Sequence, residues 1–361
     1  MSVRPNRKLT NIMVTGGAGF IGSNFIRYLF KKTDFSGLVV NVDKLTYAGN
    51  LASLSDIASE YGDKRYFFEK ADIADKKLIK NILEKYRIDT IVHFAAESHV
   101  DRSILGPGEF IETNIIGTFN LLENARNYWK GKNNVLFHHI STDEVYGSLG
   151  EDGYFYENTA YDPRSPYSAS KASSDHLVRA YYYTYNLPVT VSNCSNNYGP
   201  YQFPEKLIPV MIENMLNGKE LPVYGDGKNI HDWLYVEDHN DAVWLIMKKG
   251  RTGESYNIGG ENEWENIRLV NVLCEIAAGE IGKPKDYYKR LITFIKDRPG
   301  HDRRYAINCD KIKKELGWHQ SYRFKEGLRK TVKWYLDNRD WVKSVKTGEY
   351  KNWIESNYAK R

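Results

Sequence analysis

Residues 11–24 read NIMVTGGAGFIGSN, a short apolar run that leads directly into a glycine-rich turn. Gly17, Gly19 and Gly22 have G-x-G-x-x-G spacing, and Gly16 adds a further glycine in front of them. Glycines in this pattern let the backbone turn tightly and approach a pyrophosphate, whose charge is attracted by the N-terminus of the following helix. The spacing alone is a weak signal, because a glycine-rich surface turn gives the same pattern.

The next apolar run, LVVNVD at 38–43, strengthens this interpretation because it ends in an acid. Asp43 lies about twenty residues after Gly22, where a carboxylate accepts hydrogen bonds from the ribose hydroxyls of a dinucleotide. A carboxylate there also repels a 2′-phosphate, so NAD is favoured over NADP, although the adjacent Lys44 weakens that preference. The order is strand, glycines, helix, strand and acid. A plain surface turn would not explain this order, so a dinucleotide-binding site is the better interpretation.

Outward from this unit, apolar runs alternate with stretches of helical period. The runs are 11–16, 38–43, 65–73, 90–98, 134–142 and 187–195, and the helical stretches include 23–32, 76–86 and 119–129. Such alternation predicts βαβ units and a parallel sheet. We expect an α/β protein with a Rossmann-like, doubly wound parallel sheet and a smaller C-terminal substrate-binding domain.

A change in composition near residue 196 suggests where the two domains meet. After it, Gly, Pro and Tyr become frequent, and YNIGG at 256–260 resembles one more strand of the first sheet. We therefore expect an NAD-binding domain at 1–195, with a returning segment near 235–262. Residues 196–361 are expected mainly to bind the substrate.

Composition excludes several classes of protein. The 361 residues are 27% charged and 41% hydrophobic, with a net charge of +5 and no block of like charges that would suggest a nucleic-acid tail. The N-terminus lacks the features of a signal peptide, and no apolar run approaches membrane-spanning length. Three widely spaced cysteines suggest reduced thiols without zinc-ligand spacing. We expect a cytoplasmic protein with no metal and no nucleic-acid or membrane partner.

Residues 167–171 read YSASK, and Tyr167 and Lys171 share one face if this segment is helical. A neighbouring ammonium stabilises a phenolate and lowers the tyrosine pKa from about 10. Such a tyrosine takes the proton from a hydroxyl while hydride leaves the same carbon. With 27 tyrosines a chance match is easy, but chance explains poorly a match that follows a Rossmann-like half.

Residues 138–147 read HHISTDEVYG, so two adjacent acids, Asp143 and Glu144, follow Thr142 at the end of a β-branched run. Paired carboxylates can act as a general acid and a general base. A solvated turn or a helix N-cap explains the same residues, and on the residues alone this second interpretation is favoured.

The segment GGAGFIG together with Asp43, Thr142 and YSASK resembles the extended short-chain dehydrogenase/reductase family. Within that family, further stretches are similar to the dTDP-glucose 4,6-dehydratases over nearly the whole chain. These stretches are AAESHVDRS (95–103), STDEVYG (141–147), CSNNYGPYQFPEKLIP (194–209), DWLYVEDH (232–239), YNIGG (256–260) and DRPGHDRRYAI (297–307).

This resemblance implies dehydration of dTDP-glucose to dTDP-4-keto-6-deoxyglucose, with NAD as cofactor. Tyr167 and NAD would oxidise C4, Glu144 would remove the acidified C5 proton, and Asp143 would protonate the departing C6 hydroxyl before hydride returns to C6. Thr142 would hydrogen-bond the C4 oxygen. Asp143 has to start protonated, and repulsion from the adjacent Glu144 would raise its pKa.

The resemblance also implies which residues contact the ligands. The cofactor-binding residues would be Gly16, Gly19, Phe20, Ile21, Gly22, Asp43, Lys44, Thr46, Asp72, Ile73, Phe94, Ala95, Ala96, Ser98, Thr113, Tyr167, Lys171 and Asn197. The residues that bind the nucleotide sugar would be Ser98, Thr142, Asn196, Lys206, Leu207, Pro222, Tyr224, His231, Asn266, Arg298 and His301.

His231 departs from the family pattern, which has an arginine at this position against the diphosphate. Histidine cannot form the bidentate fork of arginine, and its charge depends on pH. We therefore hypothesise that substrate binding weakens above neutral pH.

Three alternatives stay open. The chain could be a UDP-sugar 4-epimerase that leaves both acids idle, a dehydratase for another nucleotide sugar, or a non-catalytic dinucleotide sensor. The helical stretches near 110–128 and 167–184 are apolar on more than one face. Family members pair such helices in a four-helix bundle, so we expect a homodimer; packing on the sheet is the alternative.

Overall fold

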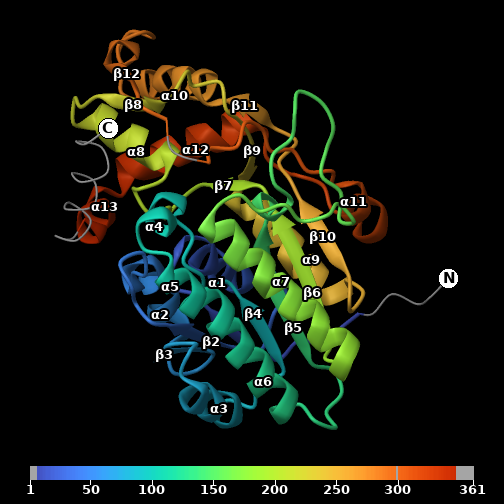
Figure 1. Ribbon diagram of the computed structural model, residues 1–361. Coiled ribbons are helices and arrows are strands. Elements are labelled where there is room, and N and C mark those ends of the chain that lie inside the picture. Colours follow the sequence, from blue (N-terminus) through green and yellow to red (C-terminus); the bar gives the residue numbers. More distant parts are fainter. Residues whose placement is uncertain (1–5, 298–299, 347–361) are drawn as a thin grey trace.

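The centre of the protein is a seven-stranded parallel sheet, seen in the computed structural model that describes residues 6–297 and 300–346 (Figure 1). Its order is β10-β6-β5-β4-β1-β2-β3. The strands are β1 (Asn11–Thr15), β2 (Leu38–Asp43), β3 (Tyr66–Lys70), β4 (Thr90–His93), β5 (Leu136–Thr142), β6 (Val189–Cys194) and β10 (Ser255–Ile258). All six predicted apolar runs and YNIGG contribute a strand, which confirms the expected Rossmann-like α/β class.

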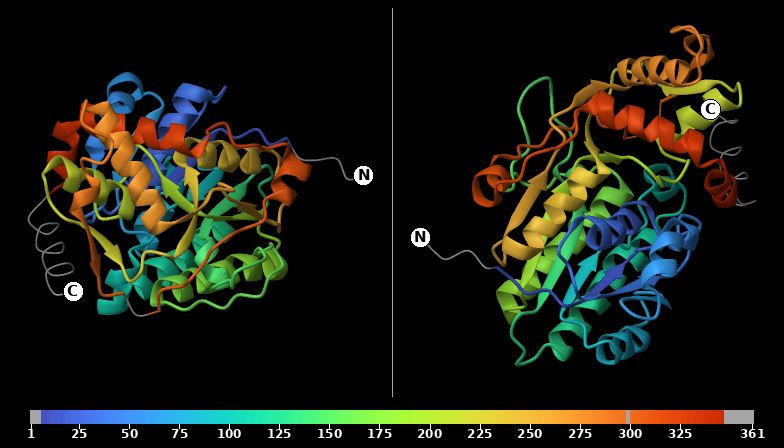
Figure 2. Two further views of the ribbon diagram at one scale, coloured as in Figure 1. Left: turned by 90° about the horizontal axis from the view of Figure 1, so that it is seen from above. Right: turned by 180° about the vertical axis from the view of Figure 1, so that it is seen from behind.

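Helices cover both faces of this sheet, which is why its strands are apolar on both sides. On β1, Ile12 and Val14 face one layer and Met13 faces the other. One layer contains α1 (Phe20–Lys32), α2 (Ser55–Tyr61), α9 (Val236–Lys249) and α11 (Asp310–Leu316), with the 3-10 turn η1 (Leu51–Leu54). The other contains α3 (Lys76–Lys85), α6 (Thr118–Tyr128) and α7 (Pro166–Tyr185), as Figure 2 shows from behind and above.

The C-terminal region has a core of its own, above the sheet in Figure 1. A three-stranded sheet contains β7 (Asn196–Tyr198), β9 (Ile230–Tyr235) and β11 (Glu263–Glu265), and a two-stranded sheet contains β8 (Leu221–Tyr224) and β12 (Ile292–Ile295). The helices packed here are α8 (Leu207–Leu216), α10 (Asn266–Glu280), α12 (Phe324–Asp337) and α13 (Arg339–Val345), with the 3-10 turn η4 (Lys289–Leu291). Because β9 runs directly into α9 and then β10, the chain returns to the central sheet before it leaves again.

The order of the parallel strands reverses direction between β1 and β4, and ligands of such sheets bind at this point beyond the carboxyl ends of the strands. The connections that follow β4 and β5 lie there. They are α4 (Val100–Leu105), α5 (Gly108–Phe110), the π-helical segment η2 (Ile111–Gly117) and the 3-10 turn η3 (Asp143–Tyr146). In the described ranges, no helix has the length and apolar character needed to cross a bilayer.

Candidate active site

A cavity of about 420 Å³ lies at the carboxyl edge of the sheet, between it and the C-terminal region. Every predicted cofactor residue lines this cavity, from Gly16 on the first turn to Asn197 on β7. The predicted substrate residues within the described ranges also line it, whereas Arg298 lies outside the described residues. Of the five predicted catalytic residues, Thr142, Glu144, Tyr167 and Lys171 line the cavity and Asp143 does not.

The glycine turn after β1 makes room for a ligand backbone to approach. Gly16 has a φ of +70°, and a Cβ on it would lie 2.6 Å from the Ala95 backbone nitrogen. A Cβ on Gly19 would contact only the Gly16 carbonyl oxygen, at 3.3 Å, and so would project into the cavity. Gly19 is also the N-cap of α1 and has no side chain to satisfy its first amides, so the turn fits a pyrophosphate. Gly17 packs against Asn41 instead.

Asp43 ends β2 and lines the cavity with an oriented carboxylate. Its Oδ2 accepts a hydrogen bond from the Ala18 amide at 2.9 Å, and its Oδ1 accepts one from the Leu45 amide at 2.8 Å. The ammonium of Lys44 lies 2.6 Å from Asp72 Oδ2, so its charge is paired with a carboxylate. This pairing reduces the attraction that Lys44 would offer to a 2′-phosphate and favours NAD.

The two adjacent acids after β5 take different positions. Thr142 is the N-cap of η3, because its Oγ1 accepts a hydrogen bond from the Glu144 amide at 3.3 Å. Glu144 lines the cavity, whereas Asp143 is only 1% exposed and lies beneath the wall. Burial raises the pKa of Asp143 well above its usual value, and the charges of Glu144 and Asp232 add to the effect. The solvated-turn alternative is therefore wrong for Asp143.

Tyr167 and Lys171 lie in the first two turns of α7, which starts sharply. Pro166 occupies its first turn, and Ser165 and Ser168 form a capping box. Both functional side chains are buried and line the cavity. The sequence places them on one face as predicted, because they are one helical turn apart.

The predicted direction of the Tyr167 pKa is wrong. Burial raises the pKa of Tyr167 well above 10, and the negative charge of Glu144 raises it further, while a hydrogen bond with Thr142 opposes the shift. Lys171 donates a hydrogen bond to the Ile140 carbonyl at 2.7 Å. The phenol is therefore protonated at neutral pH, and it is hydrogen-bonded to Thr142.

The far end of the cavity is formed by residues of the C-terminal region. Lys206 precedes α8 and donates to the Ser98 carbonyl at 2.9 Å, which fixes its ammonium beside the cofactor side of the cavity. His231 on β9 is 8% exposed, and its Nδ1 lies 3.1 Å from the amide nitrogen of Asn196. The ring of His301 lies 6.2 Å from that of His231, so two imidazoles lie close together at this wall.

The cavity also includes residues that sequence analysis did not select, among them Cys194, Gln202, Glu205 and Trp233. Glu205 is buried; it accepts a hydrogen bond from the Tyr47 hydroxyl at 3.1 Å and lies 3.4 Å from the Arg102 guanidinium. The one sequence feature that could have indicated a role for Glu205 is its position directly before Lys206, a predicted substrate-binding residue. Burial inside a turn has no periodicity, so residue patterns could not show it.

Comparisons with known proteins give a consistent result. Residues 13–331 match the family described as GDP-mannose 4,6 dehydratase. A dTDP-glucose 4,6-dehydratase of Salmonella typhimurium is 57% identical over 364 residues, which cover 97% of this chain and 99% of that protein.

Solved structures agree with this result. The crystal structure of a dTDP-glucose 4,6-dehydratase from Bacillus anthracis in complex with NAD has a TM-score of 0.82 and 46% identity, over 93% of this chain and 99% of that one. A UDP-glucose 4-epimerase from Thermotoga maritima, solved with UDP-glucose, has a TM-score of 0.80 and 30% identity, over 91% and 100% of the two chains.

Proposed function

The chain belongs to the GDP-mannose 4,6 dehydratase family, and from this premise we propose that it is an NAD-dependent dTDP-glucose 4,6-dehydratase, a hydro-lyase that forms dTDP-4-keto-6-deoxyglucose. One observation carries the proposal beyond the fold. Glu144 lines the same cavity as Tyr167 and Lys171, and a buried acid with a raised pKa, Asp143, lies directly beneath. An epimerase needs only the tyrosine, the lysine and Thr142.

The cofactor fits the residues at the carboxyl edge of the sheet. The glycine turn would hold the pyrophosphate, Asp43 the adenosine ribose, and Asp72 and Ile73 the adenine. Phe94 to Ser98, Thr113 and Asn197 would line the remainder of its path, as their place in the cavity wall supports. When bound, NAD supplies the hydride acceptor for oxidation of C4 and the hydride donor for the final reduction at C6.

Tyr167 acts as the base for the C4 hydroxyl. Its phenol starts protonated, so its proton has to pass to solvent before the phenolate can accept the C4 proton. Lys171, which lines the same cavity, would supply the positive charge that favours the phenolate. Thr142, which hydrogen-bonds Tyr167, would hydrogen-bond the C4 oxygen as well. This arrangement supports a single proton path from C4 to Tyr167.

The two acids then complete the loss of water. Once C4 is a ketone, the C5 proton is acidic, and the cavity-lining Glu144 is placed to remove it. Asp143 is buried with a raised pKa, so it holds the proton that the C6 hydroxyl needs in order to leave as water. Environment thus gives neighbouring carboxyl groups opposite roles.

We assign the dTDP diphosphate to the wall made by Asn196, Lys206, Leu207, Asn266 and the histidines His231 and His301. Pro222 and Tyr224 would pack on the base or the deoxyribose. Lys206 brings a cation, and the imidazole pair brings donors, to a ligand with two negative charges. The relative's name supports thymine over uracil as the base.

A direct assay tests this function. The protein is incubated in parallel with dTDP-glucose and UDP-glucose, and base is then added. A 4-keto-6-deoxy product absorbs in the near ultraviolet, an epimerase gives galactose, and a cofactor sensor gives neither. Formation of the keto sugar from dTDP-glucose, with slower reaction of UDP-glucose, is the expected result; release of galactose would overturn the proposal.

We infer that residues 1–195, with the returning segment near 235–262, form the NAD-binding domain and that 196–361 mainly bind the sugar nucleotide. The cofactor residues of the cavity wall come almost entirely from the first segment, which supports the division. The β9–α9–β10 connection supports the returning segment.

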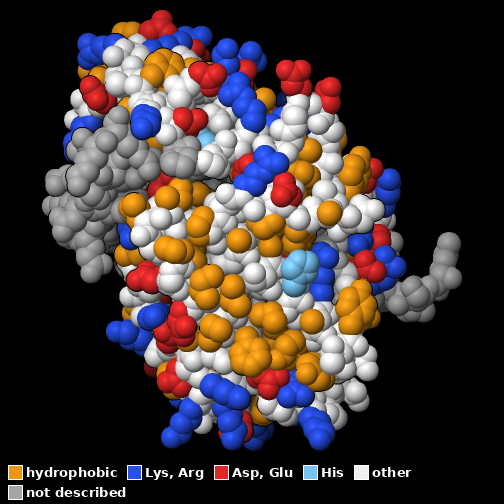
Figure 3. Space-filling view, in the orientation of Figure 1, with side chains coloured by type: hydrophobic (Ala, Val, Ile, Leu, Met, Phe, Trp, Pro, Cys, Tyr) orange, Lys and Arg blue, Asp and Glu red, His pale blue; other side chains and the backbone are white. Residues whose placement is uncertain are grey.

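We also infer a homodimer that pairs α6 and α7 with their copies. Hydrophobic side chains gather over these helices in the middle of the face seen in Figure 3. The exposed large apolar residues of η2, α6 and α7 are Ile111, Ile116, Phe119, Tyr183 and Tyr185. An apolar surface of this kind on neighbouring helices is typical of a helix-bundle interface.

A cytoplasmic location is the last part of the proposal. Cys194, Cys274 and Cys309 are all free and buried, as in proteins of a reducing compartment.

A further inference from the structure

A fully buried carboxylate lies one helical turn beyond Lys171, on the same face of α7. Asp175 has no exposed surface. Its Oδ2 accepts hydrogen bonds from the Ser141 hydroxyl at 2.7 Å and from the Tyr161 hydroxyl at 2.8 Å. Its Oδ1 lies 3.1 Å from Nε2 of His139, a buried residue of β5. None of the roles assigned above uses this carboxylate.

His139 connects Asp175 to Lys171. The Lys171 ammonium lies 3.5 Å from the same Nε2 atom of His139 and donates to the Ile140 carbonyl at 2.7 Å. Burial, together with the charge of Lys171, lowers the pKa of His139 to about 4, so the imidazole is neutral at pH 7. Burial opposes ionisation of Asp175, but the contacts with His139, Lys171 and Ser141 hold its pKa below the usual value. A neutral ring therefore lies between a cation and an anion.

The buried ammonium of Lys171 needs a counter-ion. Burial lowers the pKa of Lys171, and an ammonium buried without a counter-ion tends to lose its proton. Burial keeps the neighbouring Tyr167 and Cys194 neutral at pH 7. The ring of His93 lies 5.2 Å from that of His139, and His93 hydrogen-bonds Thr15 and Thr118. Arg179 donates to the Tyr161 hydroxyl at 3.2 Å and to the Ser255 hydroxyl at 3.1 Å. Among these neighbours of Lys171, Asp175 is thus the group that carries a negative charge.

We propose that Asp175, acting through His139, is the counter-ion that keeps Lys171 in its ammonium form beneath Tyr167. The role of this charge in catalysis rests on the proposed function, whereas the charge state itself does not. Asp175 and His139 are positioning residues, since they act through Lys171 and do not touch the sugar. The chemistry is purely electrostatic and no bond is made or broken.

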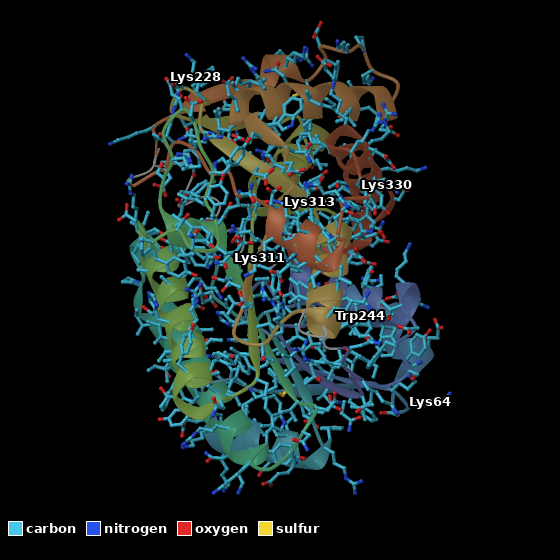
Figure 4. The ribbon with its side chains drawn as sticks, turned by 90° about the vertical axis from the view of Figure 1, so that its right-hand side faces the viewer. Lys64, Lys228, Trp244, Lys311, Lys313 and Lys330 are labelled. Atoms are coloured by element: carbon cyan, nitrogen blue, oxygen red, sulfur yellow. The ribbon has the colours of Figure 1, made fainter. Side chains whose placement is uncertain are left out.

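The charge state can be measured without catalysis. Because Lys171 lines the cavity, a small reagent such as acetic anhydride can reach its amine, and only the unprotonated amine reacts. Acetylation of the Lys171 peptide is followed by mass spectrometry from pH 6 to 11. The exposed Lys64 and Lys228, at opposite ends of the molecule in Figure 4, serve as internal references.

Four variants make the test specific. Asp175→Asn keeps the shape of the side chain and removes its charge. His139→Leu removes the imidazole between the two charges, whereas His139→Gln offers an amide N–H that can donate to Asp175 and an amide oxygen that can accept from Lys171. His138→Leu is the matched control, because His138 is equally buried on the same strand but faces Thr190 and Ser192.

We expect Asp175→Asn and His139→Leu to lower the pH midpoint of Lys171 acetylation by about one unit or more, a tenfold change in its acid constant. His139→Gln should shift it much less, and His138→Leu should leave it unchanged. Coincident midpoints for wild type, Asp175→Asn and His139→Leu would overturn the counter-ion role. If Asp175→Asn does not fold, the comparison of His139→Leu with His139→Gln still tests the counter-ion role.

The pH profile of C4 oxidation separates this proposal from the enzymatic one. If the wild type forms keto sugar, the alkaline limb of Asp175→Asn should fall about one unit earlier, with little change in rate near pH 6.5. A uniform loss of rate at every pH would indicate a merely structural role and would count against the inference. If the wild type forms no keto sugar, the proposed function fails while the acetylation result still stands.

Discussion

The hydroxyl of Thr142 lies 3.3 Å from the carboxyl group of Asp143 and also hydrogen-bonds the phenol of Tyr167. One short side chain thus joins the buried acid to the proposed base for C4. Because Thr142 ends β5 and caps η3, both contacts follow from a single strand-to-turn connection. The groups proposed for oxidation and for water loss are therefore adjacent in the structure.

We predict that Asp143→Asn stabilises the protein while it slows dehydration. The folded state raises the pKa of Asp143, so the native protein holds this proton more tightly than the unfolded chain, and wild-type stability falls as pH rises above about 4. An amide has no proton to lose. The Tm advantage of the variant should therefore grow from pH 4 to 8, by about 1.4 kcal/mol for each unit of the shift.

Turnover of Asp143→Asn should fall about 10²–10⁴-fold, the usual contribution of a general acid. Thermal denaturation across the pH range and the keto-sugar assay provide the two measurements. The exposed Asp152→Asn is the control and should change neither. A Tm difference that stays constant with pH would contradict the assignment of a raised pKa to Asp143.

Glu144→Gln should separate the two halves of the reaction. The amide cannot take the C5 proton, so C4 is oxidised but water is not lost, and absorbance of reduced cofactor near 340 nm accumulates on the protein. Keto-sugar formation should fall about 10²–10⁴-fold. Stopped-flow absorbance with dTDP-glucose measures the first step, and Glu151→Gln, in an exposed loop, is the control. Normal turnover of Glu144→Gln would show that another group is the base.

The seven strands of the central sheet could be predicted because each is an apolar run whose period differs from that of the intervening helices. The glycine turn, Asp43 and the Tyr167–Lys171 pair follow from fixed spacings along one segment. The burial of Asp143 could not be predicted, because residues 143 and 144 have the same local sequence environment. The backbone of η3 directs the carboxyl group of Asp143 into the interior and leaves that of Glu144 at the cavity.

Contacts between distant segments were also beyond sequence analysis. The sequence suggested that Lys171 lowers the pKa of Tyr167, but burial and Glu144 dominate in the folded protein. Likewise, the buried position of Glu205 depends on Tyr47 and Arg102, which belong to two other connections. Burial energies depend on what the rest of the chain places around a group, and residue spacing carries no information about that.

His231 should make nucleotide affinity depend on pH. The imidazole lies in the cavity wall beside Asn196, and a protonated ring attracts the diphosphate more strongly than a neutral one. Calorimetric titration with dTDP should therefore show weaker binding at pH 8 than at pH 6. His231→Arg should abolish most of this dependence and tighten binding at pH 8 by about tenfold or more, since hydrogen bonds to charged groups contribute about 1.5–3 kcal/mol.

The control for this series is His319→Gln, which replaces an exposed histidine. It should reproduce the wild-type titration at each pH. Equal wild-type affinities at pH 6, 7 and 8 would exclude a charge role for His231 and would leave the imidazole as a neutral donor.

The proposed dimer predicts that charges on the exposed face of η2 and α6 release monomers. Ile116 and Phe119 are 40% and 39% exposed, and glutamate at either position would bury a charge opposite the same residue of a second copy. Ile116→Glu and Phe119→Glu should halve the mass measured by light scattering after size exclusion. Phe294→Glu is the matched control, because Phe294 is more exposed, at 57%, but lies on β12 in the C-terminal region. A wild-type protein of monomer mass, or a dimer that survives both helix variants and dissociates with Phe294→Glu, would place the interface elsewhere.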